Sequence, residues 1–153
     1  MKLHKSTDRI EKTLVLRAPR SRVWHALADA AQFNAWFGVN LEGAFAPGAR
    51  IEGKLISPGH EHVTIEMAIE LMEPESRMSF RWHPYPVPAG VAFSGEPTTL
   101  VEFFLEDAEG GTRLTVVESG FDQIPLARRA EAFRMNDEGW SEQLANIARY
   151  VEG

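Results

Sequence analysis

The segment PLARRAEAFRMNDEGWSEQLANIARYV, residues 125–151, gives the rest of the chain a surface to pack on. Its apolar side chains recur at steps of seven, four, three and four residues, which follow the helical repeat, and charged residues fall between them. Pro125 suits a first helical turn because its φ is already helical. The pattern predicts one amphipathic helix roughly 40 Å long, at ~1.5 Å per residue. Its apolar stripe is Phe133, Trp140, Leu144, Ile147 and Val151.

One strand and two short helices are predicted at the beginning of the chain. In the segment 10–18, Ile10, Leu14 and Leu16 share one parity, as in a strand with one buried face. Pro19 ends this strand, and apolar residues then recur at helical spacing around Val23 and again over residues 30–37. Gly38 ends the second helix.

From Val39 onward the apolar period changes to two, and it remains two for about eighty residues. Turns rich in Gly and Pro divide this region into six strands, which favours an antiparallel meander with one covered face. The predicted fold class is α+β, with a seven-stranded antiparallel sheet wrapped around the long C-terminal helix and two short helices between strands one and two. The residues predicted to point inward include Gly53, Met67, Leu71, Phe80, Trp82, Phe103 and Val116.

Composition and charge exclude several classes of function. Sixteen basic and 22 acidic residues give a net charge of −6, which disfavours nucleic acid and anionic lipid surfaces as partners. The absence of Cys excludes disulfides, thiolate chemistry and a zinc knuckle. No apolar run is long enough to insert in a membrane, and residues 1–9 are too polar for a signal peptide. We expect a cytoplasmic protein with an N-terminal tail over 1–9 and a single domain over 10–153.

Short motifs in this order resemble a known family. They are Ala18-Pro19 before Val23-Trp24, Trp36-Phe37-Gly38, Pro47-Gly48, the run from Gly111 to Thr115, Glu118-Ser119-Gly120-Phe121, and Gly139-Trp140 before Leu144. Together they are similar to the C-terminal domain of the heat-shock-protein-90 ATPase activator and its single-domain bacterial relatives. That family belongs to the helix-grip superfamily of START-type, birch-pollen-allergen-like and polyketide-cyclase proteins. The resemblance covers residues 10–151.

The resemblance implies a helix-grip fold, often with a cavity for an apolar ligand between the sheet and the long helix. Large aromatic side chains on the inward face suit such a cavity, although they also suit a filled core. Gly53 and Gly139 lack side chains where volume is expected; Gly139 alternatively marks a kink or a close approach to the sheet. The predicted ligand-binding residues are Trp36, Phe37, Gly53, Met67, Trp82, Phe103, Glu118, Gly139 and Trp140.

Glu118 is the one acidic candidate in this set. It shares parity with Leu114 and Val116, so it tends toward the covered face, where a carboxylate needs partners and has a raised pKa. The alternative, which we prefer from sequence alone, is that the strand already ends at Ser119 and leaves Glu118 in solvent.

Other polar constellations receive plainer interpretations. His60-Glu61-His62 offers only two imidazoles beside a turn, so an exposed hairpin is preferred to a metal site. Arg81 and His83 have the parity opposite to Trp82, which places them in solvent. We predict no metal, no cofactor and no catalytic residue.

The Pro-rich segment 84–97 is longer than a hairpin requires. We interpret it as a plain connection, with a strap over the mouth of a cavity or a contact with a partner chain as the alternatives. The strap alternative predicts that the segment controls ligand access and contributes little to stability, because prolines cannot join a central ladder.

Three classes of function remain at this point. The preferred one is a non-catalytic binder, carrier or sensor of a small hydrophobic or aromatic molecule. The alternatives are a co-chaperone-like module that binds another protein through a filled domain, and a polyketide-cyclase-like or hydrolase-like enzyme that uses an inward acid or base. The chain is expected to be a monomer or a homodimer.

Overall fold

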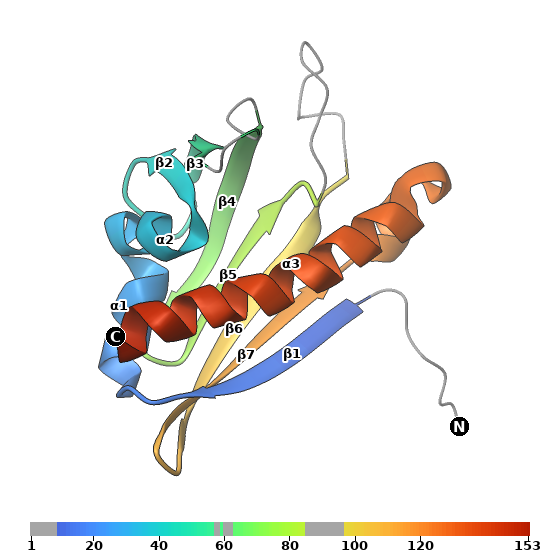
Figure 1. Cartoon of the computed structure of the whole chain (residues 1–153). Coiled ribbons are helices and arrows are strands. Elements are labelled where there is room, and N and C mark those ends of the chain that lie inside the picture. Colours follow the sequence, from blue (N-terminus) through green and yellow to red (C-terminus); the bar gives the residue numbers. More distant parts are fainter. Residues whose placement is uncertain (1–8, 57–58, 60–62, 85–96) are drawn as a thin grey trace, which may run out of the picture.

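The computed structural model describes residues 9–56, 59, 63–84 and 97–153, and it has the predicted α+β helix-grip architecture (Figure 1). The elements follow the order expected from the sequence, with one short 3-10 helix added before the long helix. They are β1 (Arg9–Leu16), α1 (Arg20–Ala28), α2 (Ala30–Phe37), β2 (Val39–Glu42), β3 (Arg50–Leu55), β4 (Thr64–Glu73), β5 (Arg77–Trp82), β6 (Thr99–Ala108), β7 (Gly111–Ser119), η2 (Phe121–Gln123) and α3 (Leu126–Glu152).

The seven strands form one antiparallel sheet in the order β1-β7-β6-β5-β4-β3-β2. Strands β2 to β7 follow one another as a meander, and β1 pairs with β7 along its whole length, from Arg9 opposite Ser119 to Leu16 opposite Thr112. Figure 1 shows α3 crossing one face of this sheet, with α1 and α2 near the C-terminal end of α3. The covered face is therefore the face to which the inward parity of the strands points.

The stripe predicted on α3 forms its contact with the sheet. Trp140, Leu144, Ile147 and Val151 are buried. Phe133 is partly buried, and its ring meets that of Phe121 edge-on with centroids 5.2 Å apart. The charged residues off the stripe, Arg134, Glu138, Glu142 and Arg149, are exposed. The amphipathic pattern thus fixes the rotation of α3 about its own axis.

Side-chain hydrogen bonds fix α2 against its neighbours. Gly38 ends the helix in the left-handed conformation, with φ of 86°. Asn34 donates to the carbonyl of Leu41 and accepts from its backbone N–H, which joins α2 to β2. The indole of Trp36 donates to the carbonyl of Ala26 at 2.7 Å, which joins α2 to α1. These bonds hold Phe37, the last residue of α2, against the interior.

The inward parity expected along β4 holds only as far as Ile69. A register shift between Ile69 and Leu71 inserts one extra residue, so Leu71 lies opposite Ser79 and Met72 lies opposite Met78. Leu71 was expected to point inward, and this expectation is wrong because a β-bulge inverts the parity of the residues that follow it. Met72 packs against the core in its place.

Two predicted features fall outside the described residues. They are the turn at His60-Glu61-His62 and the segment 85–96 of the predicted strap, of which the flanking Pro84 and Pro97 are described. Within the described ranges, no three His, Asp or Glu side chains gather as metal ligands would. No helix in this part of the chain combines the length and apolar character that crossing a membrane requires.

Candidate functional site

Glu118 lies on the covered face of the sheet and is fully buried. It stands on β7 between Ile10 of β1 and Val101 of β6. The preferred expectation that Glu118 would lie in solvent is wrong, because β7 continues to Ser119 and is flanked there by strands on both sides. The parity argument that pointed it inward is correct.

Four side chains donate hydrogen bonds to the Glu118 carboxyl group. The Trp82 indole and the Thr99 hydroxyl donate to Oε2 at 2.8 and 2.5 Å. The Trp140 indole donates to Oε1 at 2.8 Å, and the Asn136 amide nitrogen lies 3.1 Å from both oxygens. We call these five residues the Glu118 cluster. Because they come from β5, β6, β7 and α3, the cluster fastens the long helix to the middle of the sheet.

Two opposing effects set the protonation of this carboxyl group. Burial raises the pKa of Glu118 above its ordinary value and is the larger effect, whereas the hydrogen bonds from the four donors lower it. An indole nitrogen can only donate, so each of the two Trp side chains requires an acceptor at the oxygen it meets. Glu118 therefore accepts the N–H groups of both indoles, and only the apolar ring atoms of Trp82 and Trp140 are left to contact other side chains.

Two adjoining cavities lie beside the cluster, and they share Leu55, Ile65, Trp82 and Asn136 as walls. The first, about 190 Å³, is called the aromatic pocket, and its further lining residues are Phe37, Gly139, Trp140 and Gln143. The second, about 180 Å³, is called the rim pocket, and its further lining residues are Val63, Thr64, Glu66, His83, Pro84 and Met135. A cavity of about 150 Å³ with apolar walls binds benzene, so each pocket has room for about one aromatic ring.

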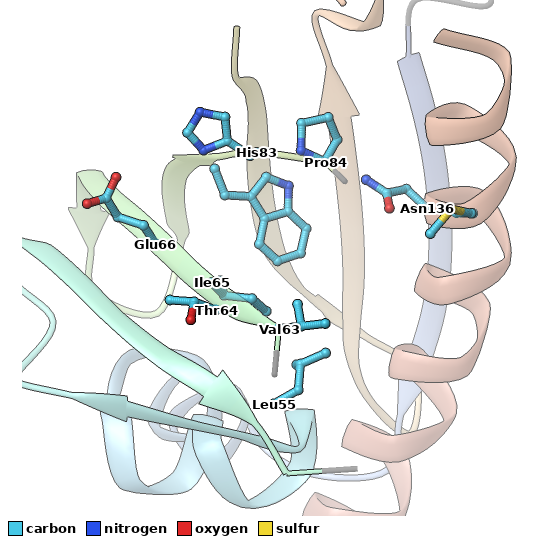
Figure 2. A pocket seen from close by; sticks show the side chains of 10 residues that line it. Leu55, Val63, Thr64, Ile65, Glu66, His83, Pro84 and Asn136 are labelled. Carbon is cyan, nitrogen blue, oxygen red and sulfur yellow. The ribbon is translucent and has the colours of Figure 1, made fainter. Parts of the chain in front are cut away.

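Figure 2 shows how the rim pocket is built from both layers of the fold. Leu55 of β3 and Val63, just before β4, approach it from one side, and the Asn136 amide projects toward it from α3. Glu66 extends away from the space, and its carboxylate lies 3.5 Å from the Arg50 guanidinium. The interior of the pocket is therefore mainly apolar, with the Asn136 amide as a polar group on the helix side.

Three aromatic rings form one end of the aromatic pocket. Trp82 and Trp140 stack with centroids 5.8 Å apart and planes 29° apart. Phe37 meets them edge-on, with centroids 6.0 Å from Trp82 and 6.3 Å from Trp140. Offset and edge-to-face pairs of this kind are the favourable arrangements of aromatic rings. They make a rigid wall.

The structure divides the predicted ligand-binding residues into two groups. Phe37, Trp82, Gly139 and Trp140 line the aromatic pocket, and Glu118 holds two of these walls in place from behind. Trp36, Met67 and Phe103 are buried in the core and line neither pocket. The Phe103 ring packs edge-on against Trp140 at 5.8 Å, so it supports the pocket wall.

Gly53 does not leave empty space. A Cβ atom at this position would lie 2.1 Å from the carbonyl oxygen of Asn40, so the backbone of β2 occupies the volume that a side chain would need. The expectation of open volume at Gly53 is therefore wrong. At Gly139 an added Cβ would meet no neighbouring atom within 4 Å, which contradicts a close approach to the sheet and leaves the cavity as its surroundings.

Sequence reasoning missed several lining residues. Asn136 precedes Trp140 by four residues and therefore shares its helix face, and this polar position within an apolar stripe was the available signal. His83 was expected in solvent, yet it is half-buried and lines the rim pocket. The expectation failed because His83 stands beyond the end of β5, where strand parity no longer applies. Arg81, by contrast, is exposed as expected, and its guanidinium pairs with the Glu70 carboxylate at 3.1 Å.

A family model described as activator of Hsp90 ATPase homolog 1-like protein matches residues 17–152. None of the curated protein sequences matches the chain.

Solved structures resemble the fold over almost the whole chain. DynU16, a protein of the dynemicin biosynthetic locus, is 26% identical with a TM-score of 0.72, and the match covers 95% of this chain and 47% of DynU16. A Mesorhizobium loti protein is 17% identical with a TM-score of 0.74, over 94% of this chain and 96% of that one. The Aha1 dimer from Colwellia psychrerythraea is 15% identical with a TM-score of 0.70, over 94% and 96%. This chain thus spans about half the length of DynU16.

Proposed function

The chain belongs to the family of activator of Hsp90 ATPase homolog 1-like proteins, and on that premise we propose that it binds a small hydrophobic or aromatic molecule between the sheet and α3 without transforming it. The observation that carries the proposal is the aromatic pocket, an apolar space of about 190 Å³ bounded by Phe37, Trp82 and Trp140. A cavity lined by large apolar side chains is the usual form of a small-molecule site.

The Glu118 cluster supports binding over catalysis. A general acid or base must lie within hydrogen-bonding reach of the proton that it transfers. The two oxygens of Glu118 are engaged by five contacts from four side chains, and Glu118 lines neither pocket. Its role in the proposal is to position the Trp82 and Trp140 walls.

The cavity also favours this proposal over a co-chaperone-like module, which needs a filled domain and an external contact surface. The two pockets are unfilled spaces, each about the size of one aromatic ring, beside an otherwise buried aromatic cluster. The side chains around them make fewer packing contacts than they would make in a filled, purely structural core. The ligand is correspondingly small, because drug-sized ligands occupy pockets of about 300 Å³ or more.

Titration with the neutral one-ring alcohol 2-phenylethanol tests the proposal, with tryptophan fluorescence as the readout. Gly139→Phe places a ring in the open space beside Gly139 and should abolish binding. Glu138→Phe adds the same ring one residue earlier, at an exposed position of α3, and should bind as the wild type does. Circular dichroism and thermal melting establish that both variants are folded. Binding that persists in Gly139→Phe places the ligand elsewhere and contradicts the proposal.

Native mass spectrometry of freshly purified protein complements the titration. A bound small molecule should appear as an added mass in the wild type and be missing from Gly139→Phe. An added mass that is equal in both proteins would place that molecule outside the aromatic pocket.

A further inference from the structure

The polar atoms around the two pockets are not balanced in charge. Among the described residues that line them there is no Lys or Arg. The lining carboxylate, Glu66, points away and is paired with Arg50. Behind the wall made by Trp82, Trp140 and Asn136 lies the Glu118 carboxyl group. Within the described part of the chain, a ligand in this space meets aromatic side chains and the Asn136 amide but no Lys or Arg.

The hydrogen bonds of the cluster decide which atoms face the ligand. Both indole N–H groups are directed at Glu118, so these two hydrogen-bond donors are not available to a ligand in the pocket. The Asn136 nitrogen lies 3.1 Å from both Glu118 oxygens, and this contact fixes the orientation of the amide because its oxygen would be repelled there. The Asn136 carbonyl oxygen is therefore the amide atom turned away from the carboxyl group, on a side chain that lines both pockets.

Gln143, further along α3, is a second amide side chain that is held by hydrogen bonds within the protein. Its amide nitrogen donates to the Phe37 carbonyl at 3.0 Å, and its oxygen accepts from Asn146, one helical turn further along, at 3.1 Å. The amide groups of the aromatic pocket are thus held by the protein, and neither replaces the missing cation.

We propose that the cavity selects small aromatic amines in their positively charged form and disfavours carboxylates of the same size. This inference rests on the proposed function and names the ligand class for the same site. The ammonium group lies over the aromatic rings and donates to Asn136 Oδ1, and the aromatic body fills the space beside Gly139. A carboxylate in the same place loses its hydration and finds no cation to replace it.

Calorimetric titration with three ligands of matched size tests this proposal: 2-phenylethylamine, 2-phenylethanol and 3-phenylpropanoate. Measurements at about pH 8 keep the amine charged. We expect the amine to bind about tenfold more tightly than the alcohol, and the propanoate to bind more weakly than both. A propanoate that binds as tightly as the amine, or equal affinities for all three, overturns the proposal while leaving the proposed function intact. Absence of binding by all three overturns both.

Two charge-removing variants locate the source of the preference. Glu118→Gln should reduce the ratio of amine to alcohol affinity toward one, whereas Glu138→Gln, which removes a charge from the exposed face of the same helix, should leave the ratio unchanged. An equal change in both variants would assign the preference to net charge and overturn the assignment to the cluster. The order of the three wild-type affinities needs no variant, so the proposal is decided even if Glu118→Gln does not fold.

Discussion

Around Gly53 the backbone of one strand presses against the next, whereas around Gly139 the helix borders open space. At Gly53 a Cβ would lie 2.1 Å from the Asn40 carbonyl oxygen, and at Gly139 it would meet nothing within 4 Å. Both glycines lack a side chain, yet one is required by close packing and the other borders a cavity. A missing side chain therefore marks a binding space only when no backbone has moved in to fill it.

The largest effect that tests this comparison is expected at Trp140, next to Gly139. Trp140→Ala removes a buried ring that packs on Trp82, Phe37 and Phe103 and deprives Glu118 of a donor. We expect the free energy of unfolding to fall by about 3 to 5 kcal/mol, measured by urea denaturation. Glu138→Ala, on the exposed face, should change it little. Equal losses in the two variants would show that this part of α3 does not hold the sheet.

A matched pair of substitutions should separate the two glycines directly. Gly53→Ala forces the β2 backbone to move and should lower the free energy of unfolding by about 1 to 3 kcal/mol. Gly139→Ala improves helix propensity at an unobstructed position and should raise it by about 1 kcal/mol. Thermal melting measures both. Changes of the same sign would remove the distinction between the filled and the open position.

Sequence reasoning anticipated these two regions unequally, and the reason is geometric. Alternation along β5, β6 and β7 gave the inward direction of Trp82, Phe103 and Glu118 correctly. It failed at Leu71, where a bulge changes the count, and at Gly53, where the approach of β2 depends on how the strands twist. Side-chain parity is a local property, whereas the distance between two backbones depends on the whole sheet.

The cavity itself was less predictable than its walls. Phe37, Trp82 and Trp140 were expected on the inward face, but the same residues suit a filled core. Whether these rings leave a cavity or fill the core depends on how they stack and on where their N–H groups point. Asn136 affects this arrangement through its hydrogen bonds to Glu118. Its position one turn before Trp140 was visible in the sequence, but the sequence did not indicate Glu118 as its partner.

The smallest expected effect is a change in the slope of stability against pH. Because the pKa of Glu118 is raised in the folded protein, the folded state holds this proton more tightly than the unfolded state does. The contribution of Glu118 is therefore fully present below its ordinary, unfolded-state pKa and is lost as the pH rises through its folded pKa. Glu118→Gln does not titrate. We expect the wild-type free energy of unfolding, relative to this variant, to decrease as the pH rises through that window.

Chemical denaturation of both proteins at several pH values measures this difference, in which the titrations common to both proteins cancel. A relative stability that rises with pH would mean that the four hydrogen-bond donors outweigh burial at Glu118. The cluster would then favour the ionised carboxylate more strongly than its burial suggests.

The pairing of β1 with β7 has a consequence for the chain during its synthesis. Thr13 of β1 and Thr115 of β7 face each other, with their hydroxyl oxygens 3.1 Å apart, and they are 102 residues apart in sequence. A ribosome that adds about 5 to 20 residues per second needs roughly 5 to 20 s to make the intervening segment. During that interval the apolar side chains of Ile10 and Leu16 have no partner strand, whereas neighbouring strands of the meander can pair as they emerge. The first strand made is thus among the last to be paired, and it is the part of the nascent chain for which protection by a chaperone matters longest.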